Sequence, residues 1–350
     1  MTGFLEVLRQ TLADTAEPGA TELCEALEEV LGTPDARDAR VQLTPLKSRV
    51  YRLSVGTNGR SRSLILKRFD PWLARRNELV ARRWLPAIGL GDRCPGLLAT
   101  TADARGQWIW HTYEDLGEGA VNPGSLDRGP AASVVDLIAE LHTRAADHAL
   151  LPECRHYCGN LGAPFLVANV RDAIAELEKL MPPRVEPTAD QRALRGRLLG
   201  RLYRLRYELP WRVQMLEARG GPDTLLHGDL WTTNTFVAVN GAAPVARLID
   251  WDHTAVGPAS YDLSTFVYRF PRAERAWIVQ TYRRSVARAG WCLAEVRDLN
   301  VLFETAEYAR YANRVIWPAA ALLQDGSAWG WEQLAEVERW FDTLEPALPG

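Results

Sequence analysis

Residues 225–234 read LLHGDLWTTN, and residues 248–252 read LIDWD. The first stretch is a short apolar run that leads into a tight polar loop containing Asp229 and Asn234. The second is an apolar run, typical of a buried strand, that ends at Asp250. Three polar side chains that bind protons or metal ions therefore follow two apolar runs within a short part of the chain.

The segment between these stretches is predicted to be a β-hairpin. It contains the pair Asn240-Gly241 between two β-rich runs, and this pair favours a tight two-residue turn. Because a hairpin returns the chain to its starting point, we expect Asn234 and Asp250 to lie close together.

The three side chains suit phosphoryl transfer. This reaction needs a carboxylate near the attacking hydroxyl group and ligands for the magnesium ion that neutralises the phosphates. Asp229 is the candidate catalytic base. Asn234 and Asp250 offer the oxygen donors that Mg²⁺ prefers, and the substrate phosphates complete its coordination shell.

The same residues resemble the catalytic and metal-binding loops of the aminoglycoside phosphotransferase and choline kinase superfamily, also called the phosphotransferase enzyme family. This is the small-molecule branch of the protein-kinase-like enzymes. The HGDLW stretch is also similar to the loop of fructosamine kinases, and residues 137–142 and 257–263 resemble two further family segments. The resemblance covers roughly residues 41–345. It implies an α+β, protein-kinase-like bilobal fold with a small antiparallel-sheet N-lobe and a mainly helical C-lobe.

Hydrophobic periodicity predicts elements that suit this fold. Helical patterns are followed by β patterns, one helix and two more β patterns, and then by long helical segments with breaks at Trp317-Pro318 and Asp325-Gly326. The predicted helices are 4–12, 21–31, 72–84, 131–146, 189–216 and 272–345, and the strands are 50–55, 63–69, 97–101 and 108–113, with an Asn58-Gly59 turn.

These patterns divide the chain into three parts. Residues 1–40 are expected to be an N-terminal helical extension, and residues 41–113 a nucleotide-binding N-lobe. Residues 114–350 are expected to form a hinge and a helical C-lobe that contains the catalytic and substrate sites.

The resemblance also implies nucleotide-binding residues. It predicts a lysine on the third strand that holds the phosphates and pairs with a glutamate on the next helix, here Lys67 and Glu78. The chain contains only three lysines, so the position of Lys67 in a strand pattern is informative. Glu114 and Leu116 lie in the segment that resembles the hinge, where backbone groups hold the base of ATP or GTP.

The loop expected over the phosphates departs from the family pattern. Residues 44–49 contain no glycine, the residue that lets a backbone approach phosphate closely. Side chains of Ser48 and Arg49, or of Lys47, are expected to replace it.

Two further residues are implied to support the catalytic loop. The resemblance assigns His227 to hydrogen bonding within the loop and not to titration during catalysis. Asp262, in the segment after the metal loop, is expected to have a supporting role as well.

The substrate pocket is expected beside the catalytic loop. Helical spacing places Glu304, Glu307, Tyr308 and Tyr311 on one face, and Asp252 and Trp231 are further candidates. Carboxylates and aromatic rings facing a cleft would suit an aminated substrate. The alternative is an ordinary acidic helix face exposed to solvent.

Composition adds few constraints. A net charge of −3 supports neither a nucleic-acid nor a membrane partner, and the arginines of residues 192–212 alternate with acidic residues, as on a solvated helix face. There is no apolar run of about 20 residues and no signal-peptide pattern at the N-terminus. Five scattered cysteines do not indicate a disulfide framework. We expect a cytoplasmic monomer or homodimer with no nucleic-acid or membrane partner.

The sequence thus predicts an ATP- or GTP-dependent, Mg²⁺-dependent kinase for a hydroxyl group of a small molecule. An antibiotic, an amino alcohol and a sugar-like metabolite all remain open as acceptor, so antibiotic resistance is among the roles that the sequence allows. The alternative, motivated by the glycine-free loop, is a catalytically inactive nucleotide-binding or scaffolding protein with the same fold.

Overall fold

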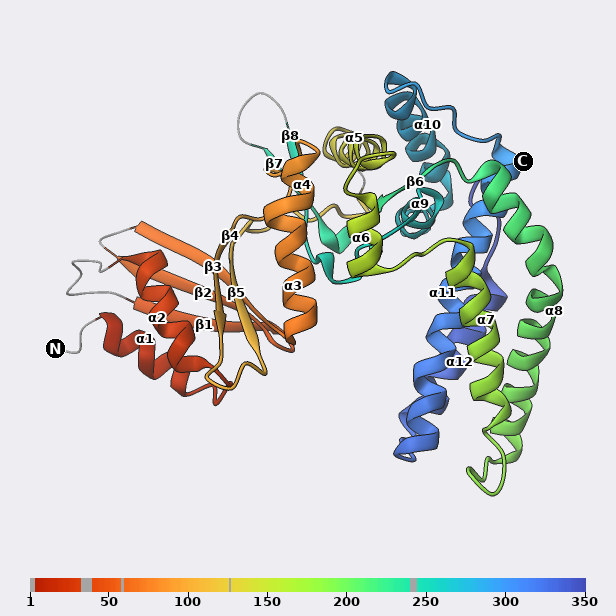
Figure 1. The fold of residues 1–350 in the computed structure, drawn as a ribbon, viewed down its shortest axis with the longest axis horizontal. Helices are drawn as coiled ribbons and strands as arrows, with labels where there is room; N and C mark the ends of the chain where they lie inside the picture. Colours follow the sequence, from red (N-terminus) through yellow and green to blue (C-terminus); the bar gives the residue numbers. More distant parts are fainter. Residues whose placement is uncertain (1–3, 33–39, 58–59, 126, 240–243) are drawn as a thin grey trace. The chain divides into compact units, whose positions relative to one another are not determined.

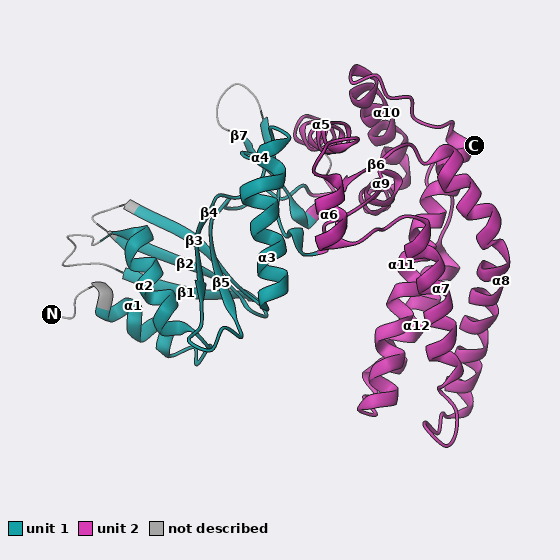
Figure 2. Cartoon of the chain, in the orientation of Figure 1, with its two compact units in different colours: residues 1–121, 233–252 teal, residues 122–232, 253–350 magenta. Residues whose placement is uncertain are grey.

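The computed structural model describes residues 4–32, 40–57, 60–125, 127–239 and 244–350. The chain forms two compact units, which Figure 2 shows in different colours. Unit 1 contains residues 1–121 and 233–252, and unit 2 contains residues 122–232 and 253–350. The boundaries predicted at residues 40 and 113 stay predictions.

A five-stranded antiparallel sheet forms the centre of unit 1, as predicted (Figure 1). The strand order is β1-β2-β3-β5-β4. The bounds are β1 Arg40–Lys47, β2 Val50–Thr57, β3 Arg60–Phe69, β4 Leu97–Ala102 and β5 Ile109–Glu114. The predicted Asn58-Gly59 turn lies outside the described residues.

The two faces of this sheet have different partners, because side chains of a strand alternate between faces. On β3, Leu64 and Leu66 are buried against helices α1 (Phe4–Ala13) and α2 (Ala20–Leu31). Ile65 and Lys67 point to the opposite face, where they line a cavity. The N-terminal helices therefore bury one face of the sheet and leave the other for the site described below.

A helical segment follows β3, as predicted. Helix α3 (Pro71–Leu79) begins with Asp70, whose side chain accepts a hydrogen bond from the Leu73 N–H, and with Pro71, whose missing N–H costs nothing there. It continues without a break into the π-helical turn η1 (Val80–Trp84) and the short α4 (Leu85–Ala87).

The predicted second hairpin also belongs to unit 1. It consists of β7 (Thr235–Val239) and β8 (Pro244–Leu248), paired so that Thr235 faces Leu248. The Asn240-Gly241 turn lies outside the described residues. This register places the start of β7 beside the end of β8.

Unit 2 is mainly helical, with one two-stranded sheet of β6 (Asp223–Leu226) and β9 (Ala255–Pro258). Helices α7, α8, α11 and α12 share one apolar core. The helix bounds are α5 Arg128–Ala145, α6 Leu151–Cys158, α7 Ala163–Glu178, α8 Ala189–Arg219, α9 Ser260–Val267, α10 Arg272–Arg288, α11 Val296–Gln324 and α12 Trp329–Thr343. An antiparallel sheet and a mostly helical remainder confirm the predicted fold class.

One predicted helix break is wrong. Helix α11 continues through Pro318 and ends only at Gln324. A proline removes one backbone hydrogen bond and usually kinks a helix. Here Pro318 is buried together with Ala319 and Leu322, so packing of the apolar face compensates for the lost bond.

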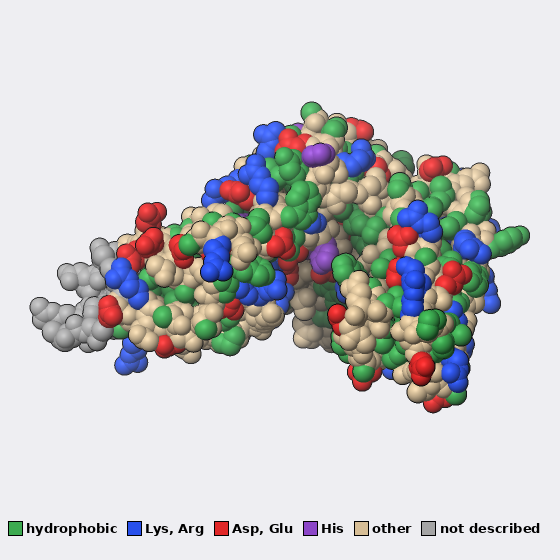
Figure 3. Space-filling view, turned by 60° about the horizontal axis from the view of Figure 1, so that its bottom comes forward, with side chains coloured by type: hydrophobic (Ala, Val, Ile, Leu, Met, Phe, Trp, Pro, Cys, Tyr) green, Lys and Arg blue, Asp and Glu red, His purple; other side chains and the backbone are tan. Residues whose placement is uncertain are grey.

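The arginines of α8 are largely paired within unit 2. Arg197 bonds both oxygens of Glu338, and Arg201 pairs with Asp342, both on α12. Charges of both signs are interspersed on the face that Figure 3 shows. Among the described helices, none has the length and apolar character of a bilayer-spanning segment. The five cysteines are free thiols.

Candidate active site

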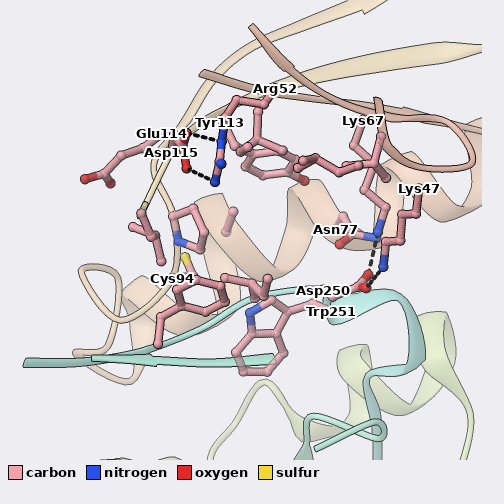
Figure 4. Close-up of a pocket in the computed structure, with 18 of the residues that line it drawn as sticks. Lys47, Arg52, Lys67, Asn77, Cys94, Tyr113, Glu114, Asp115, Asp250 and Trp251 are labelled. Atoms are coloured by element: carbon pink, nitrogen blue, oxygen red, sulfur yellow. Dashed lines mark hydrogen bonds and ion pairs between the residues drawn. The ribbon is translucent and has the colours of Figure 1, made fainter. Parts of the chain in front are cut away.

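A cavity of about 230 Å³ lies within unit 1, on the face of the sheet opposite α1 and α2 (Figure 4). Its walls are apolar and come from the sheet and from the β7–β8 hairpin. Ile65 and Val50 represent the sheet, and Phe236, Ile249 and Trp251 the hairpin. Polar side chains gather at the two ends of this cavity.

One end contains two lysines and two aspartates. The Lys67 Nζ lies 2.5 Å from Asp250 Oδ1 and 2.8 Å from both carboxylate oxygens of Asp252. The Lys47 Nζ lies 2.7 Å from Asp250 Oδ2. Figure 4 shows both lysines pointing toward Asp250. Asp250 therefore lies between two cations.

This pairing controls the charge of Asp250. Burial alone would raise its pKa, but the ammonium groups of Lys67 and Lys47 outweigh burial and hold the pKa below the usual value for aspartate. The residue also has a φ of 65°, in the left-handed region that only a few non-glycine residues adopt. Its carboxylate is thus kept ionised on a backbone that turns sharply after β8.

The predicted ion pair between Lys67 and Glu78 is not formed. Glu78 bonds Arg75 and Arg82 on its own helical segment. Lys47, Lys67, Asp250 and Asp252 are called the lysine cluster below. The side chain that α3 presents to this cluster is that of Asn77, whose Nδ2 lies 3.1 Å from Asp252 Oδ1. Successive helix residues lie about 100° apart, so a shift of one position exchanges the inward and outward side chains.

The phosphate-loop prediction needs a similar correction. Residues 48 and 49 form a two-residue turn between β1 and β2, in which Arg49 has a φ of 63°. The Arg49 guanidinium stacks on Trp108, 4.8 Å from the ring centre. Neither Ser48 nor Arg49 lines the cavity, whereas Lys47 does. The bulged register of β1 turns Lys47 toward Asp250.

The other end of the cavity is the predicted hinge. Glu114, Asp115 and Leu116 line it. Asp115 accepts hydrogen bonds from Ser63 and the Gly117 N–H and pairs with Arg52, and these contacts lower its pKa despite burial. Sequence reasoning missed Asp115, although the Asp-x-Gly spacing is typical of a turn in which the carboxylate bonds the backbone two residues on.

In the hinge, the Glu114 side chain has partners within the protein, whereas the Leu116 backbone N–H has none among the described residues. The Glu114 carboxylate bonds Arg247 at 2.8 Å and the Gly96 N–H at 3.3 Å. The N–H of Leu116 has no acceptor in the part of the chain that the structure describes. A donor at the rim of an apolar cavity is thus left for a ligand.

In unit 2 the loop that is predicted to be catalytic is held by Asp262. Its carboxylate accepts from the His227 N–H at 2.7 Å and the Gly228 N–H at 2.9 Å, and it lies 3.3 Å from His142 Nε2. Asp262 is fully buried; burial would raise its pKa, but these hydrogen bonds and the neighbouring imidazoles lower it. The His142 Nδ1 in turn lies 2.9 Å from the Tyr282 hydroxyl.

Gly228 cannot be replaced without moving this loop. Its φ is 81°, and a Cβ atom there would lie 1.8 Å from the His253 carbonyl oxygen. Only glycine tolerates both conditions. The backbone can therefore turn directly before Asp229, whose own N–H lies 3.4 Å from His227 Nδ1.

The predicted metal ligands meet at the base of the hairpin in unit 1. Asn234 is buried, and its backbone oxygen accepts a 3.0 Å hydrogen bond from Ile249, the residue before Asp250. No group of three or more His, Cys, Asp and Glu side chains among the described residues is placed to hold a metal ion. An amide oxygen and a carboxylate are donors that suit Mg²⁺ together with phosphate oxygens.

The predicted substrate residues belong to both units. Asp252 belongs to the lysine cluster of unit 1. In unit 2, Glu304 and Tyr308 face Arg212 of α8. Glu307 is buried and pairs with Arg310.

Only part of the predicted helix face lines a cavity. Glu307 and Tyr311 do so together with Trp231, whereas Glu304 and Tyr308 do not. The four residues share one side of α11, but a helix in a bundle is covered on several sides. Helices α8 and α12 cover the part of α11 that contains Glu304 and Tyr308.

Comparison with known proteins gives the family. The profile of the phosphotransferase enzyme family matches residues 44–299, which is more than half of the chain. The chain belongs to the phosphotransferase enzyme family. Comparison of this phosphotransferase with curated proteins finds no sequence match.

Solved structures share the fold of this phosphotransferase at low sequence identity. A spectinomycin phosphotransferase in complex with ADP and spectinomycin is 11% identical, with a TM-score of 0.57 over 93% of this chain and 95% of that chain. A Plasmodium vivax ethanolamine kinase is 12% identical, with a TM-score of 0.58 over 94% and 89%. An aminoglycoside phosphotransferase from Streptomyces rimosus in complex with ADP and streptomycin is 17% identical, with a TM-score of 0.51 over 86% and 100%.

The contacts of α3 predict different effects for two adjacent residues of the phosphotransferase. Asn77→Ala removes a hydrogen bond to the partly buried Asp252 carboxylate, and a bond to a charged group is worth about 1.5 kcal/mol, which corresponds to about tenfold in kcat/KM. Glu78→Gln breaks only half-exposed ion pairs and should change kcat/KM by less than about twofold. Steady-state kinetics of both variants would decide, and a larger defect in Glu78→Gln would restore the original pairing.

Asp262 is predicted to contribute to the stability of the chain. Asp262→Asn leaves one acceptor oxygen for two backbone donors and should lower the free energy of unfolding by about 3 kcal/mol. Asp172→Asn, which breaks an exposed pair with Arg171 on α7, is the control and should change it by less than about 0.5 kcal/mol. Urea denaturation measures both, and equal effects would contradict the role given to Asp262.

Proposed function

We propose that this protein transfers the γ-phosphoryl group of ATP or GTP to a hydroxyl group of a small molecule, with Mg²⁺ as cofactor. The observation that carries the proposal is the cavity of unit 1. It is apolar along its length, with two lysines and the ionised Asp250 at one end and an unsatisfied backbone donor at the other. A nucleotide fits this arrangement, because its planar base suits the apolar walls and its anionic phosphates suit the lysines.

The base would lie between the apolar walls at the hinge end. Ile65 and Val50 on one side and Ile249 on the other offer flat apolar contacts. The Leu116 N–H would donate to a ring nitrogen of the base, and the Glu114 backbone carbonyl would accept from an exocyclic amino group. The Glu114 side chain is engaged by Arg247 and is not needed for this contact.

The phosphates would lie at the lysine end. Lys67 and Lys47 are held there by Asp250, with their ammonium groups already directed into the cavity. Lysine binds phosphate as a point charge, so no glycine-rich backbone is needed for these two contacts. Lys47 is the side chain that we propose in place of a glycine-rich loop.

Magnesium would be bound by Asp250 and Asn234. Both residues flank the hairpin, at its exit and entry, and their oxygen atoms suit this ion. The ion would neutralise charge on the phosphate oxygens as the phosphoryl group leaves. Asp250 would then exchange part of its contact with the lysines for contact with the metal.

Asp229 would act as catalytic base. As the hydroxyl oxygen of the acceptor bonds to the γ-phosphorus, its proton passes to the Asp229 carboxylate, and the bond to the nucleoside diphosphate breaks. The position of Asp229 depends on the loop that Asp262 and Gly228 fix. The loop continues directly into β7, so Asp229 and the proposed metal ligand Asn234 are five residues apart in the sequence.

Proteins with this fold support the proposal of a nucleotide and a small-molecule acceptor as substrates. The spectinomycin and Streptomyces rimosus phosphotransferases were solved with ADP and with an antibiotic, and the Plasmodium vivax protein is an ethanolamine kinase. Two of these structures contain ADP, and all three proteins are named for, or bound to, a small molecule. The acceptor of this chain is a separate question.

Asp229→Asn should abolish turnover while nucleotide binding persists, because the base is removed and the shape is kept. General-base losses of about 10² to 10⁴ in rate are typical. The assay measures ADP release with ATP and Mg²⁺ over a panel of amino alcohols, sugars and antibiotics, and calorimetry measures ADP binding. Near-normal turnover by Asp229→Asn would refute the assignment, and ADP binding without any turnover by the wild type would favour the inactive alternative.

Asp250→Ala should eliminate Mg²⁺-dependent turnover, and Asn234→Ala should weaken it less. The carboxylate provides charge as well as an oxygen ligand, whereas the amide provides only an oxygen. Rates measured against Mg²⁺ concentration would separate the two variants by the concentration needed for half-maximal rate. An unchanged Mg²⁺ dependence in Asp250→Ala would place the metal elsewhere.

A further inference from the structure

Unit 2 contains its own cavity, with a volume of about 410 Å³. It begins at the catalytic loop, because Trp231 forms part of its wall and donates its backbone N–H to the Asp229 carbonyl at 2.8 Å. Helices α10, α11 and α12 and the segment after α9 contribute to the other walls. An acceptor bound there would lie beside the residue that we propose as base.

Arginine dominates the charge of this cavity. The lining contains four arginines and two glutamates. Glu307 is buried and paired with Arg310, which also bonds the Tyr261 carbonyl oxygen. Arg275 lies 3.6 Å from Glu345, a residue outside the lining. Glu336 is bonded by Gln333.

Two cations of the lining, Arg269 and Arg314, have no carboxylate within ion-pair distance among the described residues, although Glu307 and Asp229 act on Arg269 at longer range. Arg314 is exposed and follows Arg310 by one helical turn on α11. Arg269 lies over the Trp231 ring, 4.1 Å from its centre, and its Nε is buried without a hydrogen-bond acceptor. Burial lowers the pKa of Arg269, although arginine stays charged at neutral pH.

A half-buried guanidinium that is stacked on an indole and has no anion in direct contact gains from a ligand that supplies one. Its planar fork matches a carboxylate or a phosphate, which accepts two parallel hydrogen bonds. The remaining walls are aromatic, from Tyr268, Tyr311 and Trp340. Such rings cover the apolar face of a sugar or another ring.

The sign of this cavity is opposite to the one expected from the sequence, which suggested carboxylates for an aminated substrate. We propose that the acceptor is a hydroxylated compound that carries an anionic group, a carboxylate or a phosphate, and that Arg269 and Arg314 bind this group. The proposal rests on the proposed function for the identity of the reaction, and it assigns the class of acceptor.

Binding of small anions tests this without knowledge of the acceptor. The full-length protein is titrated by calorimetry with inorganic phosphate, with D-glucuronate and with D-glucosamine. The variants are Arg314→Gln and Arg269→Gln. Lys67→Met removes the other candidate phosphate site, and Arg204→Gln on α8, exposed and outside the cavity lining, is the matched arginine control. Melting curves check that each variant is folded.

We expect glucuronate to bind at least tenfold more tightly than glucosamine. The glucuronate affinity should fall at least tenfold in Arg314→Gln and Arg269→Gln and stay within about twofold in Lys67→Met and Arg204→Gln. Because Lys67 is itself a candidate phosphate site, phosphate is compared in the Lys67→Met background, where adding Arg314→Gln or Arg269→Gln should lower its affinity at least tenfold. In ATP-dependent turnover, anionic panel members should show a raised KM in Arg314→Gln with little change in the KM for ATP.

Several outcomes would overturn the proposal. These are no binding of either anion, tighter binding of glucosamine than of glucuronate, and loss of glucuronate binding in Lys67→Met but not in Arg314→Gln. The proposed function fails by a separate measurement, the absence of ADP binding and of phosphoryl transfer. An anion site in unit 2 without nucleotide binding would therefore leave this inference intact and reject the kinase.

Discussion

The ion pair between Lys67 and Asp250 is the contact on which the proposed site in the unit 1 cavity depends. Lys67 lies on the central strand β3, and Asp250 follows the last strand of the β7–β8 hairpin. Their contact closes one end of the cavity between sheet and hairpin. A half-buried pair of this kind contributes little net stability, since desolvation offsets much of the attraction. Its value lies in holding opposite charges where phosphates and a metal ion would bind.

In each unit, neighbouring donors or cations keep a buried or partly buried aspartate ionised. In unit 1 two ammonium groups keep Asp250 ionised, and in unit 2 two backbone N–H groups and two histidines keep Asp262 ionised. Asp262 has a structural role, because both of its carboxylate oxygens accept hydrogen bonds from the backbone of the loop. Asp250 is engaged by side chains that a ligand can recruit. The Arg269 and Arg314 guanidinium groups are the opposite case, charges without such a partner among the described residues.

Local signals in the sequence were sufficient for the fold class. The alternation on β3 and the apolar runs of the strands depend on neighbours in the chain, so they can be read from it. Which side chain of α3 points inward could not be predicted from the sequence. The choice between Asn77 and Glu78 depends on how the helix is rotated relative to a hairpin that is distant in the chain. The direction of Arg49 likewise depends on Trp108, 59 positions away.

Transfer of phosphate to a small molecule is the central claim, and it can be measured before the acceptor is known. The protein is incubated with Mg²⁺, ATP labelled in the γ-phosphate, and a protein-free extract of small molecules separated into anionic, neutral and cationic fractions. We predict label in a stable phosphate monoester of low molecular mass, formed with an equal amount of ADP and only with Mg²⁺ present. Label found solely in inorganic phosphate or on the protein, with every fraction, would contradict the account.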